Sequence, residues 1–460
     1  MSGLFAAPSH AEWEAQAVKA LKGAPVEGLT RIDADGLSVG PLYAAAGVAP
    51  VFAARAAAAD GRAWDLRTLV EGDDPEAVND AVLADLEGGA ASVVLSGEVL
   101  ADSGPLGRAL AGVAMELAAV GLDAGLDGPE AADALAVVAK GSPRARLMFH
   151  MDPISAFAAA GGSPRLIGEH LGLAANTAAR HAGAYPDATF FLASGRVVHE
   201  AGGSAGQELG LAAASVVACA RAGIDAGLPV EQMLRGTVLG VAVDVEYFDS
   251  LAKVRALRLI WGSLTRAFGV AAPAVIEARS SRRMLSRRDP WPNLLRLTAA
   301  GFAGAVGGAD AVALDGFTRA AGRPDAFARR QARNAQLVLM EEAHLGRVDD
   351  PAAGSWFLDA RTRDLAEAGW AEFQRIEDEG GVVAALKAGT IQARVADARA
   401  RLLATLSGGA AHLVGVTKFV DADVRMAPVE AAPDNLVTGG GDVCEPLTAI
   451  RLAAPFEAAA

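Results

Sequence analysis

The sequence predicts an α/β protein built as a (β/α)8 TIM barrel, with an N-terminal arm and a C-terminal helical extension. Two observations favour this fold. Short apolar runs alternate with long helical patterns from about residue 62 to residue 314, and they supply eight candidate strands. Parallel strands need helical crossovers, and a closed sheet leaves no exposed edge. A doubly wound open sheet is the alternative arrangement of the same units.

The predicted arm covers residues 1–45. Residues 10–22 place Trp13, Ala17 and Leu21 on one helical stripe, and the Gly-Ala-Pro run at 23–25 ends the helix. The extended segment that follows has no obvious core of its own. It therefore has to pack on the body of this chain or on another subunit, and we expect it to wrap around a subunit.

The predicted barrel domain covers residues 46–325. Helices are expected over 74–86, 105–120, 163–182, 205–223 and 248–268, the first with Asp74 as N-cap and Pro75 at its first position. Strands are expected at 63–70, 91–95, 122–125, 145–150, 188–193, 237–243, 272–276 and 309–314. A helical extension packed on the barrel follows over 326–426, with helices at 326–344, 362–379 and 390–407 and one short strand at 411–420. Residues 427–460, rich in Pro, Gly and Ala, are predicted to be a surface tail or linker.

The composition limits the classes of partner. The chain has 41 Lys and Arg against 55 Asp and Glu, a formal net charge of -14, which disfavours nucleic acid and anionic membrane surfaces. No apolar run approaches the roughly 18 to 20 residues of a membrane span, and we see no secretory signal. The only cysteines, Cys219 and Cys444, form no Cys-x-x-Cys motif, so neither a disulfide framework nor a cysteine zinc site is expected. These features favour a cytoplasmic protein.

Motifs for cofactor or metal binding are scarce. A Gly-x4-Gly-Lys-Ser/Thr phosphate loop is absent, and the glycine clusters do not match a dinucleotide fingerprint. The seven histidines never pair at i, i+4, so we expect no metal site.

Two polar pairs are candidates for catalysis. His150 and Asp152 close the predicted strand at 145–150, where period two points both side chains the same way at the end of a barrel strand. They could act as acid and base, but Asp152 could equally cap the next turn and His150 fill the barrel mouth. His199 and Glu200 follow the next strand, where a pocket would lie, and the structural alternative is a loop histidine beside a glutamate that orders the turn.

Long stretches of the chain resemble the acyl-CoA mutase barrel of methylmalonyl-CoA mutase. Residues 251–261 (LAKVRALRLIW) look like that family's Ala-Lys-x-Arg-Ala-x-Arg-x-x-Trp helix. Residues 332–344 (ARNAQLVLMEEAH), 348–356 (VDDPAAGSW) and 379–383 (EGGVV) resemble its later blocks in the same order. The resemblance covers almost the whole chain and implies a TIM barrel.

Other segments are similar to the small, β subunit of the heterodimeric enzyme. They are residues 64–67 (WDLR), 73–88, 281–296 (SRRMLSRRDPWPNLLR) and 306–310 (VGGAD). Catalytic chains carry Tyr-His-x-Gln-Glu-Ala-Gly where this chain has 196–202 (RVVHEAG), so Val197 stands at the histidine that hydrogen-bonds the substrate thioester. The family's two other substrate loops are replaced by 307–314 (GGADAVAL) and 279–283 (RSSRR).

The resemblance also bears on the cofactor. In this family, cobalt is held by the histidine of an Asp-x-His-x-x-Gly loop, and none of the seven histidines here has Asp two residues earlier. The resemblance therefore implies a small subunit that binds no cofactor and has no catalytic residue of its own. Adenosylcobalamin and the isomerisation of methylmalonyl-CoA and succinyl-CoA are expected on a large catalytic subunit. The alternatives are a split mutase that works with a separate cobalamin-domain chain, and a barrel repurposed for non-radical chemistry.

Overall fold

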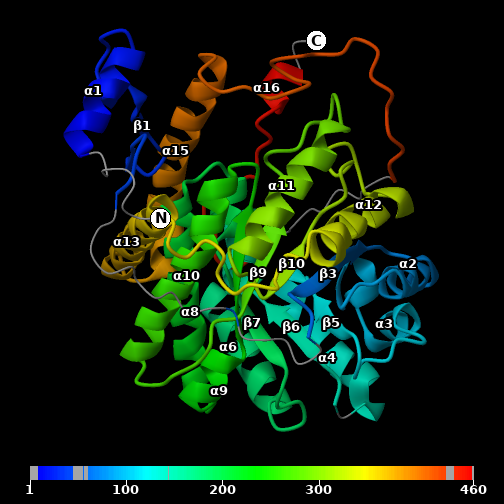
Figure 1. Cartoon of the computed structure of the whole chain (residues 1–460). Helices are drawn as coiled ribbons and strands as arrows, with labels where there is room; N and C mark the ends of the chain where they lie inside the picture. Colours follow the sequence, from blue (N-terminus) through cyan, green and yellow to red (C-terminus); the bar gives the residue numbers. More distant parts are fainter. Residues whose placement is uncertain (1–8, 45–54, 56–60, 143, 431–439, 458–460) are drawn as a thin grey trace.

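Eight parallel strands close into a barrel in a computed structural model that describes residues 9–44, 55, 61–142, 144–430 and 440–457 (Figure 1). β10 pairs with β9 on one side and with β3 on the other, so the predicted TIM barrel is confirmed and the open-sheet alternative is wrong. The barrel strands are β3 (Asp65–Glu71), β4 (Ser92–Ser96), β5 (Ala119–Leu122), β6 (Leu147–Met151), β7 (Thr189–Ser194), β8 (Thr237–Val243), β9 (Ile276–Ser280) and β10 (Ala311–Ala313).

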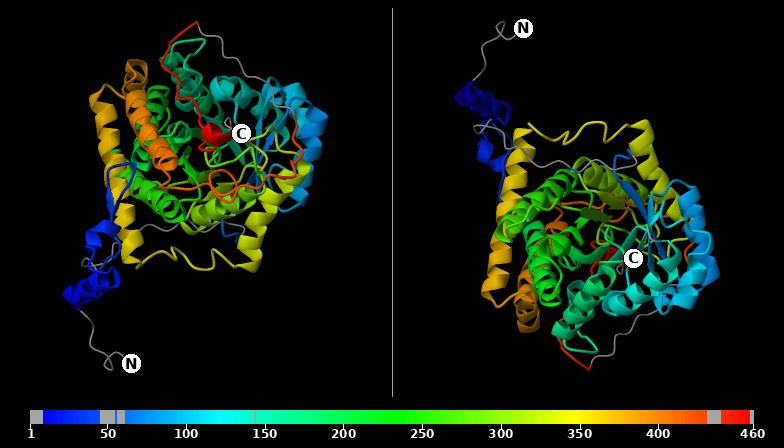
Figure 2. Two further views of the ribbon diagram at one scale, coloured as in Figure 1. Left: turned by 90° about the horizontal axis from the view of Figure 1, so that it is seen from above. Right: turned by 90° about the horizontal axis from the view of Figure 1, so that it is seen from below.

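Helices surround the barrel, and the apolar core lies between them and the strands (Figure 2). The first one begins as predicted, with the Asp74 carboxylate accepting a hydrogen bond from the Ala77 amide at 3.4 Å and Pro75 in the first turn. The α-helices of the barrel are α2 (Pro75–Glu87), α3 (Ser103–Ala109), α4 (Gly128–Val138), α5 (Pro153–Ala160), α6 (Ile167–His181), α7 (Arg196–Glu200), α8 (Ala205–Asp225), α9 (Val230–Arg235), α10 (Tyr247–Ala267) and α11 (Pro292–Val306). Short 3-10 turns are η2 (Glu98–Leu100), η3 (Gly125–Asp127) and η4 (Ala139–Gly141).

Four predicted elements differ from the structure. The strand predicted at 122–125 lies at Ala119–Leu122, because Gly125 takes a left-handed φ of 58° and begins a 3-10 turn. The helix predicted over 105–120 ends at Ala109, and Gly112 then takes a left-handed φ of 79° that breaks a helical path. The strand predicted at 272–276 begins only at Ile276, because Pro273 has no amide to donate to a ladder. Residues 411–420 form turns instead of the predicted strand, with the Gly415 amide donating to the Lys418 carbonyl at 2.9 Å.

The C-terminal extension packs one long helix against the barrel helices. Its elements are α12 (Ala326–Leu337), the π turn η5 (Val338–Glu342), α13 (Trp356–Asp378), α14 (Val382–Ala388), α15 (Thr390–Ser407) and α16 (Ala454–Glu457). A Cβ at Gly369 of α13 would lie 2.7 Å from the Leu209 Cβ of α8 and 2.9 Å from the Ile260 Cδ1 of α10. Only glycine allows so close an approach, which fixes α13 on these two helices.

The N-terminal arm consists of α1 (His10–Ala20), the turn η1 (Val26–Leu29) and a hairpin of β1 (Arg31–Ile32) and β2 (Ser38–Val39). α1 buries no residue and projects away from the body in both views of Figure 2. The hairpin is attached through Asp33, which pairs with Arg361 of α13 at 2.5 Å, and through Asp35, which accepts from the Gly206 amide at 3.0 Å. Residues 1–8 and 45 of the predicted arm lie outside the described residues.

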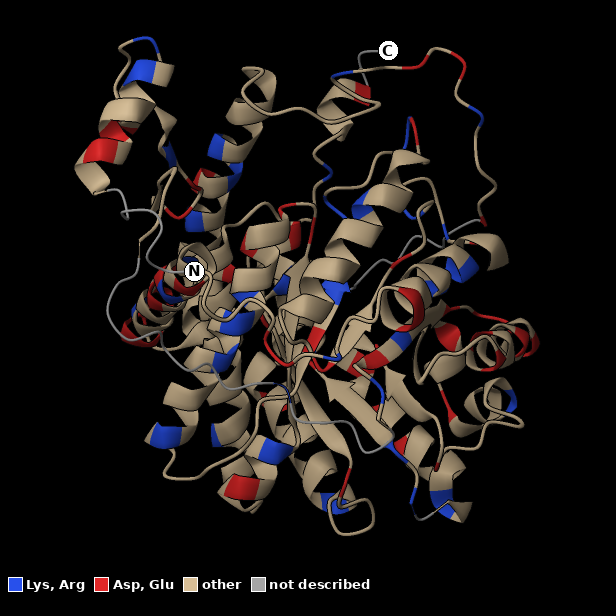
Figure 3. Ribbon diagram, viewed as in Figure 1, with Lys and Arg blue, Asp and Glu red and all other residues tan. Residues whose placement is uncertain are grey.

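Figure 3 marks the positions of Lys and Arg interspersed with those of Asp and Glu along the helices. The whole sequence has an acidic balance, with 41 Lys and Arg against 55 Asp and Glu. In the described part of the chain, no helix is long and apolar enough to cross a bilayer.

Candidate functional site

Charged side chains occupy part of the barrel interior, where branched apolar residues are usual. Glu277 and Arg279 are two residues apart on β9, and Asp65 and Arg67 are two residues apart on β3. Residues two apart on a strand lie on the same face, which for both pairs is the inside of the barrel. The small residues of β10 lie between them in the register, since Ala313 pairs with both Arg67 and Arg279. The interior space beside β10 is therefore left for long charged side chains.

These side chains form one ion-paired network across the barrel. Glu277 accepts from Arg67 Nη1 at 2.5 Å and from Arg279 Nε at 2.6 Å, and Arg196 Nη1 approaches it at 3.3 Å. Arg279 Nη1 also pairs with the carboxylate of Asp123, the residue after β5, at 2.6 Å. Burial alone would raise the pKa of Glu277, but the guanidinium groups of Arg279 and Arg67 hold that pKa well below its usual range. The carboxylate is thus ionised and saturated with donors.

His150 lies in this charged interior and contacts no hydrogen-bond partner. Its side chain is 5% exposed, and within the described residues neither ring nitrogen has a donor or acceptor. Its backbone has a φ of 46°, and the pairing of β6 with β7 is irregular between Met148 and Met151. Burial lowers the pKa of His150 to about 3, so the ring is neutral near pH 7.

Asp152 caps a helix instead of completing a pair with His150. Its carboxylate accepts from the Ser155 amide at 3.0 Å, at the N-cap of α5. Burial raises the pKa of Asp152 to about 6. No hydrogen bond or ion pair joins it to His150 in the part of the chain described. The irregularity in β6 interrupts the period-two alternation from which the pairing was predicted.

His199 belongs to a second buried polar cluster, between α7, α8 and β8. Its Nε2 lies 2.8 Å from the Ser281 hydroxyl, and its Nδ1 lies 3.4 Å from Glu208. Glu208 is also bound by Lys253 of α10 at 2.6 Å and by the Ala242 amide at 2.6 Å. Burial, then the charges of Arg283 and Lys253, lower the pKa of His199. Despite burial, Lys253 lowers the pKa of Glu208 to about 2.

Glu200 orders the turn after β9. Its two carboxylate oxygens accept from the backbone amides of Arg282 at 3.0 Å and Arg283 at 2.9 Å. Both oxygens are committed to backbone donors, and the neighbouring His199 faces its own cluster. The structure therefore places the two residues in separate hydrogen-bonded groups.

The chain's C-terminal segment covers part of the face where catalytic residues of TIM barrels sit. Residues 440–457 run over the loops that follow β6, β7 and β9, above the ring of helices in Figure 2. The Leu447 amide donates to the Ala158 carbonyl at 2.7 Å and the Ile450 amide to the Glu200 carbonyl at 2.8 Å. Glu457 accepts from the Arg287 amide at 2.6 Å. Residues 431–439 and 458–460 of the predicted tail lie outside the described residues.

The interior network was missed in the sequence, although a signal for it was present. Glu277 and Arg279 sit at alternate positions in an otherwise apolar run, as do Asp65 and Arg67. Charges at period two in a central barrel strand indicate a polar interior. Elsewhere, the described residues contain no group of three or more His, Cys, Asp or Glu side chains that could hold a metal ion.

The fold and this interior define a class, the (β/α)8-barrel proteins whose inner surface is polar. A family model described as methylmalonyl-CoA mutase matches residues 131–438. The chain belongs to the methylmalonyl-CoA mutase family.

Individual relatives agree with this assignment. The methylmalonyl-CoA mutase small subunit of Streptomyces virginiae is 36% identical, over 93% of this chain and 74% of the relative. The small subunit of Propionibacterium freudenreichii subsp. shermanii is 32% identical, over 83% of this chain and 64% of the relative. The large subunit of the enzyme of Porphyromonas gingivalis is 29% identical, over 49% of this chain and 32% of the relative. The chain spans between about half and three quarters of the length of the small-subunit relatives.

Proposed function

We propose that this chain is the small, non-catalytic subunit of a heterodimeric, adenosylcobalamin-dependent methylmalonyl-CoA mutase. The interconversion of methylmalonyl-CoA and succinyl-CoA takes place on the large subunit. One observation carries the proposal: the network of Arg67, Glu277 and Arg279 occupies the barrel interior with paired charges. A substrate could enter only by breaking these ion pairs, at a cost of several kcal/mol.

The residue at the position of the family's thioester-binding histidine also supports a non-catalytic role. That residue is Val197 in this chain, and it packs against the apolar core of the barrel. A valine side chain has no hydrogen-bond donor, so it cannot polarise a thioester carbonyl. His199, two residues later, is buried, and both of its ring nitrogens face groups of this chain, Ser281 and Glu208.

The cofactor that the family implies does not fit the residues present. A cobalt ligand needs an accessible imidazole, but His150, His170 and His199 are buried. The partly buried His181 already contacts Asp133 at 2.7 Å. The exposed His10, His344 and His412 lack the Asp-x-His-x-x-Gly context. We therefore place adenosylcobalamin on the partner subunit.

The arm supplies a surface for that partner. α1 carries Trp13, and Leu21 follows it at the C-cap; both are partly exposed, while the hairpin behind them is fixed to the body by Arg361. Partly exposed apolar side chains held away from their own domain gain free energy when a second subunit covers them. The relatives named small and large subunit support a partner of the same family.

The test is reconstitution with the large subunit from the same source. The chain alone should give no turnover of methylmalonyl-CoA with adenosylcobalamin, and the mixture should be active and co-elute. His150→Ala, Asp152→Ala, His199→Ala and Glu200→Ala should leave the turnover number of the assembled complex unchanged.

Two outcomes would contradict the proposal. Turnover by this chain with a free cobalamin-domain protein, without the large subunit, would favour a split mutase. Loss of turnover in any of the four variants with assembly intact would favour a barrel with its own non-radical chemistry.

A further inference from the structure

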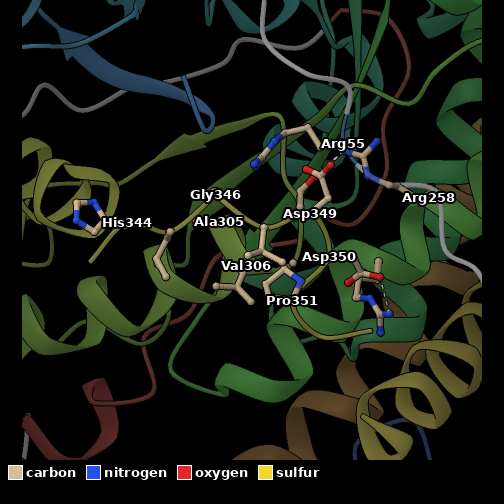
Figure 4. Close-up of a pocket in the computed structure, with 14 residues that line it drawn as sticks. Arg55, Arg258, Ala305, Val306, His344, Gly346, Asp349, Asp350 and Pro351 are labelled. Atoms are coloured by element: carbon tan, nitrogen blue, oxygen red, sulfur yellow. Dashed lines mark hydrogen bonds and ion pairs between the residues drawn. The ribbon is translucent and has the colours of Figure 1, made fainter. Parts of the chain in front are cut away.

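A cavity of about 160 Å³ lies between the end of α11 and the loop 344–351 (Figure 4). The side chains that line it are mostly apolar. They come from the end of α11, with Ala305, Val306 and Gly308, and from the loop, with Leu345, Val348 and Pro351. A Cβ at Gly308 would meet no atom of the described chain within 4 Å, so this wall of the cavity is open. Because Val348 and Pro351 are exposed, the cavity can be reached from solvent.

The charged groups at the cavity are engaged by the chain itself or lie at the rim. Arg258 pairs with Asp310 at 2.6 Å, and Arg255 pairs with Asp350 at 2.9 Å. Asp349 is exposed on the loop. An apolar centre with polar groups at its edge is the usual anatomy of a protein–protein contact. The lining therefore favours an apolar group as the occupant.

Large apolar side chains are exposed beside the cavity. Val348 at the rim is 64% exposed, Trp356 at the start of α13 is 54% exposed, and Phe248 at the start of α10 is 53% exposed. The ring of Phe357 lies 5.6 Å from that of Phe248 and 5.1 Å from that of Tyr43 in the arm, measured between centroids. Exposed apolar residues that gather in one place mark interaction sites.

The same surface continues to the N-terminal arm. Val306 of the cavity and Phe357 pack on one small apolar cluster, which includes Leu358. Ile32 and Leu42 of the arm are exposed as well. Figure 2 shows the arm and the loop between η5 and α13 on the same side of the barrel in both views. The cavity, the exposed aromatic residues and the arm thus form one continuous surface.

We propose that this cavity receives an apolar side chain of the large subunit, at the centre of the contact between the two subunits. The inference rests on the proposed function. The large subunit is the occupant because the arm, which it is proposed to cover, is part of the same surface. A cavity of about 150 Å³ holds a benzene-sized group, so a Leu, Met or Phe side chain fits. Such anchors in pockets dominate the binding energy of many interfaces.

The experiment is a calorimetric titration of the full chain with the large subunit from the same source. Val348→Asp should weaken binding about tenfold or more, because it places a charge where water is excluded. Val306→Phe should also weaken binding, because its ring occupies the space that the partner's side chain needs. Thermal melting of this variant verifies that it is folded. The matched control is Val137→Asp on α4, which is 61% exposed and does not line the cavity. It should bind like the native protein.

The outcomes separate this surface from the subunit role. Native affinity in Val348→Asp would overturn the surface and leave the subunit role intact, and native affinity in Val306→Phe would overturn the insertion of a side chain. If the native chain does not bind the large subunit, both proposals fail. Light scattering of the chain alone tests the other occupant. A dimer that Val348→Asp converts to a monomer would assign the surface to a second copy of this chain and overturn the proposal.

Discussion

Glu277 is the residue on which the interior charges converge. It is completely buried and lies within ion-pair distance of Arg67, Arg196 and Arg279. The network is favourable only as a set, because each buried guanidinium group depends on a nearby carboxylate to offset its loss of hydration. The effect of a substitution therefore depends on whether it leaves a charge without its partner.

Glu277→Gln should lower the free energy of unfolding by about 3 to 5 kcal/mol, since it removes one buried charge and leaves its partners. Urea denaturation measures the change. Glu231→Gln is the control, because Glu231 forms an exposed i, i+4 pair with Arg235 and should cost at most about 0.5 kcal/mol. Equal losses in the two variants would show that the interior network does not stabilise the fold.

The burial of the neutral His150 ring leads us to expect that the stability of the fold depends on pH. The ring is neutral in the folded chain down to about pH 3, whereas in the unfolded chain it protonates near its ordinary pKa of 6.5. Between these values the unfolded state binds more protons, so stability falls as the pH falls. His150→Gln should remove this loss and gain roughly 2 kcal/mol on the native protein between pH 7 and pH 5. His412→Gln, an exposed histidine, should show no such gain.

The sequence could predict the place of the candidate residues but not their partners. His150 and Asp152 do lie at the end of β6 and just after it. Their separation arises from the left-handed backbone of His150, which no periodicity indicates. For His199, the partner Ser281 follows β9, 82 positions further along the chain, so only the folded barrel brings the two together.

At the scale of elements, the N-terminal arm is held by side chains and not by a core of its own. Asp35 binds the start of α8, where it accepts from the Gly206 amide and from the Ser204 hydroxyl, and its pKa is raised by burial. Arg361 pairs with Asp33 of the hairpin and Asp249 of α10. These contacts fix the direction in which α1 leaves the body.

Asp35→Ala should loosen the hairpin without unfolding the barrel. The substitution removes an anion from a helix N-terminus, a loss of about 1 kcal/mol that is local to this contact. Hydrogen exchange should accelerate at residues 31–39 and stay unchanged in β3 to β10. Glu27→Ala, on the exposed side of η1, is the control. Unchanged exchange at 31–39 in Asp35→Ala would mean that the other contacts of the hairpin, with Arg361, Arg401 and Asp249, anchor the arm without Asp35.

Element prediction succeeded where the local signals agreed with the tertiary context. α2 has a cap and Pro75 at its start, and α8 and α10 have long uninterrupted helical patterns. The strand predicted at 272–276 lies too early in the sequence compared with β9, because the prediction followed the apolar run and stopped at the charged residues Glu277 and Arg279. In the structure these charged residues belong to the strand and face the barrel interior. The turns at 411–420 contain apolar residues that contact neighbouring helices, which the sequence pattern cannot distinguish from a strand.

For the whole molecule, the closed barrel has consequences beyond stability. Losing Arg67 or Arg279 alone leaves Glu277 with fewer compensating cations, and losing Glu277 alone leaves Arg67 and Arg279 with one carboxylate each, Asp65 and Asp123. An open, ligand-accepting interior would thus require several substitutions, and each intermediate sequence would carry a buried charge with fewer partners than now. Stepwise mutation towards such an interior would therefore pass through less stable proteins, so the paired charges constrain how the sequence can evolve.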